Sequence, residues 1–510
     1  MLDTLNELLA NRLLVVAVVG MGLIFTVRSR AMQIRHFFGM FAVLRRSFHH
    51  DAGRFSAYQA LTMSLAGRVG SGNIAGVAFA VAVGGPGAVF WMWVVGILGM
   101  VTSYFECSLA QLFKVTNSDG SYRGGPAFYI ERGLGRRWLA LLFSGLLVLH
   151  AGFLMNAFQS FTTASSLQDA FGISTSQSGV IMVVVLGFIV FGGIRRIVTA
   201  ADVLVPFMVL GYLAAAIFVI ATHIEDVPRV ITMIVTHAFG IEQVLGGGVG
   251  AAIVNGAKRG LFSNEAGLGT APNVAAIAQT RHPAAQGMLQ ALSVFIDTLI
   301  VCTATAVIVL FSEAYTQSTS ANGVLLTQTA LTEHLGPWGG PFISIAIVLF
   351  AFTSVMYSYY LAENCLMHMG LGGRAPIAAF RVLSLAVVYW GTQQDLSTIF
   401  RMADLMMACL AGVNLYALAS LSGLGLRLLR DYEQQLREGR TEPELDPAAY
   451  ADVNLDHDAW RGRGRSASRI RLSADSSVTR GQATLSRRNP SPPAPYIAPS
   501  SSTTRACSAR

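Results

Sequence analysis

Apolar residues gather in stretches of about 20 along most of the chain, and polar residues are concentrated in the connections between them. A stretch of this length can cross a bilayer as one helix. The pattern therefore predicts an all-α, multi-pass membrane protein with about eleven transmembrane helices. The predicted spans start near residues 9, 57, 87, 138, 177, 199, 242, 288, 338, 375 and 397.

Glycines interrupt the second span near its start. Within LAGRVGSGNIAGVAFAVAVGGPG, the run Gly70-Ser71-Gly72-Asn73 has little propensity for helix. Unwound backbone at membrane depth is tolerated only where it lines a cavity, and broken helices form the ligand sites of secondary transporters. We therefore expect a binding site at this interruption.

A second glycine-interrupted segment follows five spans later. Gly246, Gly247, Gly248 and Gly250 precede the sequence NGAKRGLFSNEAGLG. Because an odd offset reverses the direction through the membrane, the two segments are expected to run antiparallel, as in inverted-topology repeats. The alternative is that these glycines only allow helices to pack closely.

The composition agrees with this class of protein. Of 510 residues, 53% are hydrophobic and 13% are charged, and the mean hydropathy is +0.53. The chain has no phosphate-binding loop, no zinc motif and no Cys-x-x-Cys pair, and its five cysteines are scattered. We expect no enzyme activity, no cofactor beyond a coupling ion, no nucleic-acid binding and no obligate protein partner.

Basic residues occur in every second predicted loop. By the positive-inside rule, the N-terminus lies outside the inner cell membrane and the C-terminus lies in the cytoplasm. This distribution also explains the net charge of +8. The basic loops contain Arg28, Arg30, Arg35, Arg45 and Arg46, then residues 114–137, Arg195 and Arg196, residues 258–281, and Arg374.

The predicted organisation has a helical core and a polar end. The last segment is first acidic and then rich in Arg, Ser and Pro, which predicts disorder. The predicted segments are an N-terminal helix (1–30), a cytoplasmic loop (31–56), a first five-helix repeat (57–222), an external loop (223–241), a second repeat (242–427) and a disordered cytoplasmic tail (428–510).

Five motifs between residues 70 and 306 resemble those of the alanine or glycine:cation symporter family. The resemblance implies sodium-coupled uptake of alanine or glycine on a leucine-transporter type of fold, with one additional N-terminal helix before a 5+5 inverted repeat. The motifs are GSGNIAGVA (70–78), GGPGAVFWMWV (84–94), YRGGPAFYI (122–130), KRGLFSNEAGLGTAPN (258–273) and FIDTLIVCTATA (295–306).

The resemblance also implies how the substrate carboxylate is bound. Backbone amides near Gly70, Ser71 and Gly72 would hold it, which suits the positive end of a half-helix. Asn73 would bridge the carboxylate or a second cation through its amide oxygen, or it would only cap the helix at the interruption.

Other positions are implied to contact the rest of the substrate. Asn156 and Gln159 would face the amino group, although ordinary interhelical hydrogen bonds are the alternative. Carbonyls at Gly248 and Gly250 would also face the ammonium group. Phe262 would form a pocket wall, or simply belong to the core.

A sodium site is implied between the second and ninth spans. Its ligands would be the carbonyls of Ala66, Val69 and Phe350 and the hydroxyls of Thr353 and Ser354. Hard cations bind such oxygens. The spacing within each group falls on one helix face.

Asp297 leaves an alternative open, because an ionisable residue within a span usually marks function. It could be a proton site, which would make the protein a proton-coupled symporter, or it could pair with Arg68. We expect the Arg68 head to reach the cytoplasm or an acid. A membrane sensor that binds an amino acid without transporting it is a further alternative. A membrane enzyme using Asp297 or His150 lacks a convergent nucleophile or metal cluster.

Overall fold

The computed structural model describes residues 6–48, 54–240, 248–317, 323–394 and 396–460. It is mostly helical, and residues 1–459 form one compact unit. The Arg-, Ser- and Pro-rich part of the predicted tail, residues 461–510, lies outside the described residues. Gly246 and Gly247, part of the predicted second interruption, also lie outside the described residues.

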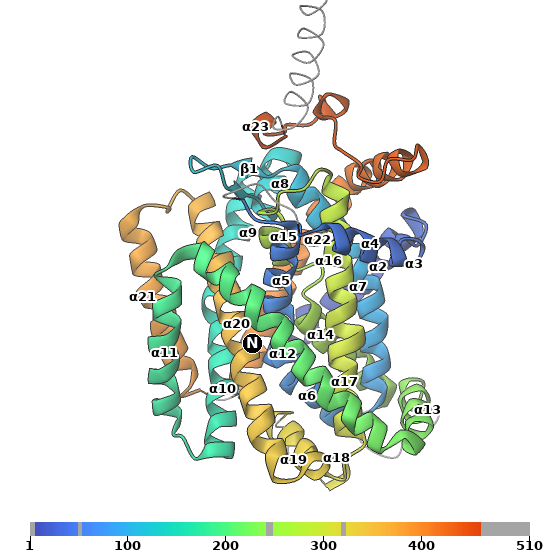
Figure 1. Ribbon diagram of the computed structural model, residues 1–510, viewed down its shortest axis with the longest axis vertical. Helices are drawn as coiled ribbons and strands as arrows, with labels where there is room; N and C mark the ends of the chain where they lie inside the picture. Colours follow the sequence, from blue (N-terminus) through green and yellow to red (C-terminus); the bar gives the residue numbers. More distant parts are fainter. Residues whose placement is uncertain (1–5, 49–53, 241–247, 318–322, 395, 461–510) are drawn as a thin grey trace, which may run out of the picture. The chain divides into compact units, whose positions relative to one another are not determined.

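Helices account for nearly all of the described elements (Figure 1). The α-helices are α2 (Leu14–Arg28), α3 (Met32–Arg35), α4 (Phe37–Arg46), α5 (Ala57–Arg68), α6 (Ala75–Gly84), α7 (Gly87–Leu112), α8 (Pro126–Leu134), α9 (Arg137–Leu149), α10 (Asn156–Phe171), α11 (Thr175–Val190), α12 (Gly193–Thr222), α13 (Val227–Ala238), α14 (Gly248–Asn264), α15 (Ala271–Ala275), α16 (Pro283–Val294), α17 (Thr303–Leu310), α18 (Ala314–Gln317), α19 (Gly323–Leu335), α20 (Gly339–His368), α21 (Arg374–Gly391), α22 (Leu396–Arg437) and α23 (His457–Trp460).

Short elements of other kinds join or extend these helices. Wider π-helical turns, which occur often at functional sites, begin or interrupt several of these helices. The π-helical turns are η1 (Asn6–Leu13), η3 (His150–Met155) and η5 (Phe295–Cys302). The 3₁₀ turns are η2 (Ser71–Asn73), η4 (Ile224–Asp226), η6 (Gly336–Trp338) and η7 (Pro447–Tyr450). Strands β1 (Val115–Thr116) and β2 (Tyr122–Arg123) form an antiparallel hairpin.

Several helices are long and apolar enough to cross a membrane. Among the described residues there are seven, or eight when the bent pair α5 and α6 is taken as one span. These lengths show a multi-pass membrane protein. The seven are Asn6–Arg28, Gly87–Leu112, Arg137–Phe171, Gly193–Thr222, Pro283–Leu310, Gly323–His368 and Ile399–Arg437.

The second predicted span is broken where the glycine run predicts it. Helix α5 begins after Ser56, whose side chain forms a capping box with Gln59. It ends at Arg68, and after the short η2 turn the chain continues as α6 at an angle of 55°. All residues from Leu65 to Ala78 are buried, so the interruption lies inside the protein.

The second interruption lies later in the sequence than expected. Helix α14 is continuous from Gly248 to Asn264, so the glycines at its start do not break it within the described residues. The chain turns instead at Glu265, Gly267 and Gly269, which have φ values of +54°, +92° and +80°. Gly is favoured where φ is positive, whereas one Gly inside a helix costs only about 1 kcal/mol.

The segment after α22 is ordered as far as Trp460, which differs from the expected disorder from residue 428. Leu445, Tyr450 and Leu455 are buried although their neighbours are acidic and polar. The N–H of Leu445 donates to the carbonyl of Arg281 at 3.0 Å. Regularly spaced apolar residues therefore fix this segment to the helical core.

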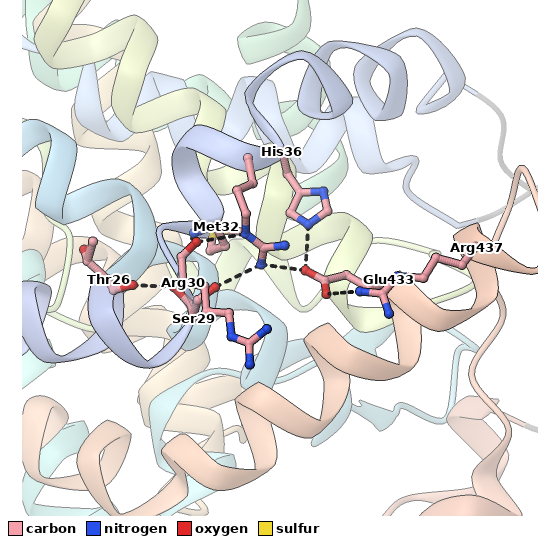
Figure 2. A network of polar contacts seen from close by, with 8 residues as sticks. Thr26, Ser29, Arg30, Met32, His36, Glu433 and Arg437 are labelled. Carbon is pink, nitrogen blue, oxygen red and sulfur yellow. Dashed lines mark hydrogen bonds and ion pairs between the residues drawn. The ribbon is translucent and has the colours of Figure 1, made fainter.

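The loop after the first span is tied to the end of α22 through Glu433 (Figure 2). Its carboxylate lies 2.8 Å from the side-chain nitrogens of both Arg35 and His36, and 3.5 Å from Arg437. Two segments almost 400 residues apart in the sequence are thereby held together.

Candidate functional site

The interruption between α5 and α6 frees a buried carbonyl. In a continuous helix the N–H of Gly70 would bond the carbonyl of Ala66. Here it bonds the carbonyl of Arg68 and the Oδ1 of Asn73, each at 3.0 Å. The Ala66 carbonyl instead accepts a hydrogen bond of 2.9 Å from the Oγ of Ser354.

The oxygens expected to bind sodium come from α5 and α20, which pack together. On α20, the Oγ1 of Thr353 donates to the carbonyl of Phe350 at 3.0 Å. Val69 is buried where α5 ends, and its N–H donates to Leu65. The structure therefore joins Ala66 to Ser354 directly and Thr353 to Phe350, and all five predicted ligands are buried.

The next residues along the interruption face α10. The N–H and the Oγ of Ser71 donate to the Oε1 of Gln159 at 3.2 and 2.5 Å. Thr162, one turn further along α10, donates to the Ser71 Oγ at 2.9 Å. A Cβ on Gly70 would lie 2.5 Å from the Ser354 Oγ and 2.9 Å from the Gln159 Nε2. Only glycine fits between these two side chains.

Asn156 has a different environment from Gln159, although both lie on α10. Its Nδ2 donates to the carbonyl of Gly152 in the preceding turn at 3.0 Å. Its Oδ1 is buried and has no hydrogen-bond partner among the described residues. The structure thus brings Gln159 to the interruption and leaves Asn156 with an unused acceptor in the interior.

Phe262 covers the other side of the interruption. Its ring lies 3.0 Å from the position of a Cβ on Gly72. The ring also meets Phe158 and Phe400, with centroid distances of 5.0 and 5.7 Å. Phe262 therefore lies against the backbone of the broken helix, and its role as a pocket wall stays a prediction.

An ion pair lies over these aromatic rings. The guanidinium of Arg259 is 4.4 Å from the centroid of Phe400 and forms an ion pair with Asp404. Lys258 binds the second carboxylate oxygen of Asp404 at 2.6 Å. Nothing in the sequence indicated that these residues meet, because α14 and α22 are far apart along the chain.

Gly248 and Gly250 lie away from this cluster. Both are exposed at the start of α14. A helix rises about 1.5 Å per residue, so Gly250 is about 18 Å from Phe262 along the axis. The structure does not bring these two glycines to the interruption.

Asn73 connects the interruption to Asp297. Its Nδ2 donates to the Asp297 Oδ1 at 2.5 Å. The other carboxylate oxygen accepts hydrogen bonds from Ser263 and Thr298 at 2.8 and 2.9 Å. Asp297 lies in the π-helical turn η5 and is fully buried. Ser263 was not among the predicted site residues, and only its place in the family motif could have indicated it.

Arg68 neither reaches the cytoplasm nor pairs with an acid, which corrects both expectations for it. It is 1% exposed, and no carboxylate lies within 4 Å of it in the described part of the chain. Its guanidinium donates to neutral oxygens of Asn264, Gln290 and Ser103. These oxygens satisfy the cation locally, so it needs no path to water.

Three buried acids surround this cation at longer range. Glu106, Glu265 and Asp297 each interact electrostatically with Arg68. Glu106 accepts hydrogen bonds from Gly267 and Asn414. The interior around both interruptions therefore holds more acidic than basic groups.

The chain matches a family model along most of its length. Residues 1–447 match the model described as the sodium:alanine symporter family. The chain is 43% identical to the amino-acid carrier protein AlsT of Bacillus subtilis, over 84% of this chain and 90% of that protein.

Two further relatives carry more specific names. The probable sodium/glutamine symporter GlnT of Bacillus subtilis is 41% identical, over 89% of this chain and 93% of that protein. The sodium/alanine symporter AgcS of Methanococcus maripaludis is 34% identical, over 83% of this chain and 95% of that protein. Among solved structures, a mutant manganese transporter of Eremococcus coleocola covers 75% of this chain and 81% of its own, with 12% identity and a TM-score of 0.49.

Proposed function

The chain belongs to the sodium:alanine symporter family, and we propose that it takes up alanine or glycine together with sodium by alternating access. It is a multi-pass membrane transporter and not an enzyme. The observation that carries the proposal is the hydrogen bond between Ser354 and the released carbonyl of Ala66. It joins two oxygens of a hard-cation site across the broken helix.

The proposed architecture is eleven spans in the inner membrane, with the N-terminus outside and the C-terminus in the cytoplasm. One N-terminal helix would precede two inverted repeats of five. Two interrupted segments support this arrangement, one between α5 and α6 and one between α14 and α15. The basic loops support the orientation.

Sodium would bind where the Ser354 hydroxyl meets the Ala66 carbonyl. The ion would replace that hydrogen bond, because both oxygens can then point their lone pairs at the cation. Val69, Phe350 and Thr353 would complete the ligands. Glu106, Glu265 and Asp297 share this interior with Arg68, and any of them that is ionised would favour a bound cation there.

The substrate carboxylate would bind at the turn formed by Gly70, Ser71 and Gly72. Ser71 already donates its N–H and its hydroxyl to one oxygen of Gln159, so a carboxylate oxygen could take the same place. Gln159 would then turn toward the amino group. Its neighbour Asn156 offers a second, unused acceptor.

The space beside this turn supports a small substrate. Phe262 lies against Gly72 and would limit the length of the substrate side chain. Asn73 would hold the turn in shape through Gly70 and Asp297. We leave Gly248 and Gly250 out of the proposed pocket because they lie well apart from it.

Sodium and substrate would depend on each other through α5. Sodium would join the end of α5 to α20, and the substrate would bind the turn that follows directly. Each ligand then stabilises the geometry that the other needs. Because this coupling is reciprocal, alanine must raise the affinity for sodium by the same factor as sodium raises the affinity for alanine.

Proton coupling through Asp297 is the second candidate. Asp297 is buried, accepts three hydrogen bonds and has no basic partner within 4 Å among the described residues. Ionisable residues buried within membrane spans often belong to proton relays, which supports this candidate.

Uptake into proteoliposomes distinguishes these possibilities. Purified protein would be given radiolabelled alanine, glycine or glutamine under an inward sodium gradient, or under an inward proton gradient without sodium. Concentrative uptake with sodium alone supports the proposal. Uptake with protons alone would reject sodium coupling and support proton coupling through Asp297. Binding without uptake under either gradient would identify a sensor.

A further inference from the structure

Asp202 is a half-buried carboxylate on α12 with no basic side chain within 4 Å in the part of the chain that the structure describes. Its two oxygens accept hydrogen bonds from α5. The Gln59 Nε2 donates to one at 3.0 Å, and the Thr62 Oγ1 donates to the other. A carboxylate can accept about four hydrogen bonds, so Asp202 has acceptor capacity beyond these two contacts.

The position of Asp202 relates it to the proposed sodium site. Thr62 precedes Ala66 by one turn of α5, a rise of about 6 Å. Further along α12, the Met208 sulfur lies 3.7 Å from the Thr353 Oγ1. Helix α12 packs against both α5 and α20, as Figure 1 also shows. It therefore runs from Asp202 to the level of the predicted ion ligands.

Asp202 lies on the cytoplasmic side of that site in the proposed orientation. Helices α5 and α12 both begin there, α5 after a basic segment and α12 with Arg195 and Arg196 in its own first turn. Arg195 and Arg196 precede Asp202 by about two helical turns, and both are exposed. A sodium ion that leaves Ala66 toward the cytoplasm along α5 would meet Thr62 and Asp202 first.

We propose that Asp202 and Thr62 form a transient sodium site on the path by which the ion is released into the cytoplasm. The inference rests on the proposed sodium symport. A carboxylate and a hydroxyl are oxygen ligands suited to a hard cation. A negative charge one turn from the main site lowers the barrier for an ion that has left its ligands but has not yet reached water.

The alternative is a purely structural role, in which Asp202 only holds the first turns of α5 in place. Gln59 already belongs to the capping box with Ser56, and Asp202 would orient it. The two roles differ in what they predict. A structural role requires hydrogen-bond acceptors and affects every ligand, whereas a release site requires the negative charge and affects sodium on the cytoplasmic side alone.

The test measures sodium on each side of the membrane separately. Right-side-out membrane vesicles allow external sodium to drive alanine uptake and internal sodium to inhibit it. We expect Asp202→Asn to raise the internal sodium concentration for half-inhibition about tenfold and to slow turnover. The external sodium dependence should change by less than about twofold, because the main site is intact.

Matched variants separate charge from shape. Asp202→Glu should retain much of the internal sodium effect, and Thr62→Ser should behave like the wild type, whereas Thr62→Val should resemble Asp202→Asn. Asp169→Asn, an exposed acid on α10, serves as the control. Sodium-dependent binding of alanine, measured at equilibrium, confirms that each variant is folded.

Two results would overturn the inference. Internal inhibition that is unchanged in Asp202→Asn would show that the charge is not on the release path. If Asp202→Asn shifts the internal sodium concentration for half-inhibition and the external sodium dependence of uptake equally, Asp202 has a structural role. Failure of the proposed function is seen separately, because the wild type would then show no sodium-driven uptake at all.

Discussion

The guanidinium of Arg68, the last residue of α5, donates a hydrogen bond of 2.7 Å to the carbonyl of Asn264, the last residue of α14. A cation at a helix C-terminus is favoured by the helix dipole. Arg68 thus lies at the ends of both interrupted helices. One side chain ties together the two places where the membrane-embedded backbone is unwound.

Replacing Arg68 should separate these two interruptions. Arg68→Gln removes the charge and most of the donors, and we expect a loss of at least about 3 kcal/mol of stability, since hydrogen bonds to charged groups contribute about 1.5–3 kcal/mol each. Arg68→Lys should recover only part of it, because an ammonium lacks the planar fork of donors. Thermal unfolding in detergent measures both.

Arg196 is exposed, and Arg196→Gln serves as the control for Arg68→Gln. It should leave thermal unfolding within about 0.5 kcal/mol of the wild type. Full stability of Arg68→Gln together with normal sodium-dependent uptake would show that the link between α5 and α14 is dispensable.

Removing the hydroxyl of Ser354 should weaken sodium binding. Ser354→Ala deletes one proposed ligand and leaves the Ala66 carbonyl without its partner. We expect the sodium concentration for half-maximal uptake to rise about tenfold, equivalent to about 1.4 kcal/mol. Thr353→Ala should act in the same direction. Alanine affinity measured at saturating sodium should change much less in either variant.

Ser358→Ala, one turn further along α20, provides the matched control and should not alter sodium dependence. If Ser354→Ala and Thr353→Ala both keep the wild-type dependence on sodium, the assignment of the ion to α5 and α20 is refuted.

The glycines of the broken helix should differ sharply in their tolerance of a methyl group. In Gly70→Ala, the new Cβ would collide with Ser354 and Gln159, the side chains at the proposed ion and substrate positions. We expect loss of sodium-dependent alanine binding. Gly76→Ala has no atom within 4 Å of the new Cβ and lies inside α6. It should bind normally and gain up to about 1 kcal/mol of stability.

Binding isotherms of both variants, with the protein shown to be monodisperse, make this comparison. Wild-type binding by Gly70→Ala would mean that the interruption can widen without affecting either ligand, which contradicts a preorganised site at Gly70.

Local patterns were sufficient to predict the first interruption, because the closely spaced glycines with Ser71 and Asn73 have low helix propensity within an apolar span. The second could not be located in the same way. Gly250 is tolerated within α14, while the turn depends on the positive φ of Glu265 and its glycine neighbours, and only Gly267 and Gly269 give a local signal. The polar composition predicted disorder between residues 438 and 460, but three apolar side chains in this segment are buried against the protein.

Contacts between distant helices were beyond local reasoning altogether. The ion pair of Arg259 with Asp404, and the hydrogen bonds of Asp202 to α5, each join residues about 140 positions apart. Their side chains have no pattern that selects one partner among several. The family resemblance assigned Ser71 and Gln159 to one site, and the structure shows that the two residues are in contact. A family pattern carries three-dimensional information that local patterns lack.

The N-terminus of α16 should become less stable as the pH falls, because its cap depends on a neutral His282. The Nδ1 of His282 accepts the N-terminal hydrogen bond of α16 from Ala284 at 3.1 Å, and its Nε2 lies 3.2 Å from Asp431. A neutral imidazole with its proton on Nε2 satisfies both contacts, whereas a protonated ring loses the acceptor. Burial lowers the pKa of His282, and the hydrogen bond to Asp431 opposes this only in part.

The direction of the pH effect follows from that shift. Below the ordinary histidine pKa of about 6.5, the unfolded chain binds a proton more readily than the folded one, so the free energy of unfolding decreases as the pH falls. Above that value, the contribution of His282 to the free energy of unfolding should be constant. Loss of the helix cap should contribute about 1 kcal/mol. Thermal unfolding between pH 8 and pH 5.5 measures the effect, and His282→Asn should reduce it, because an amide can cap α16 without titrating. An equal pH dependence in that variant would place the titrating group elsewhere.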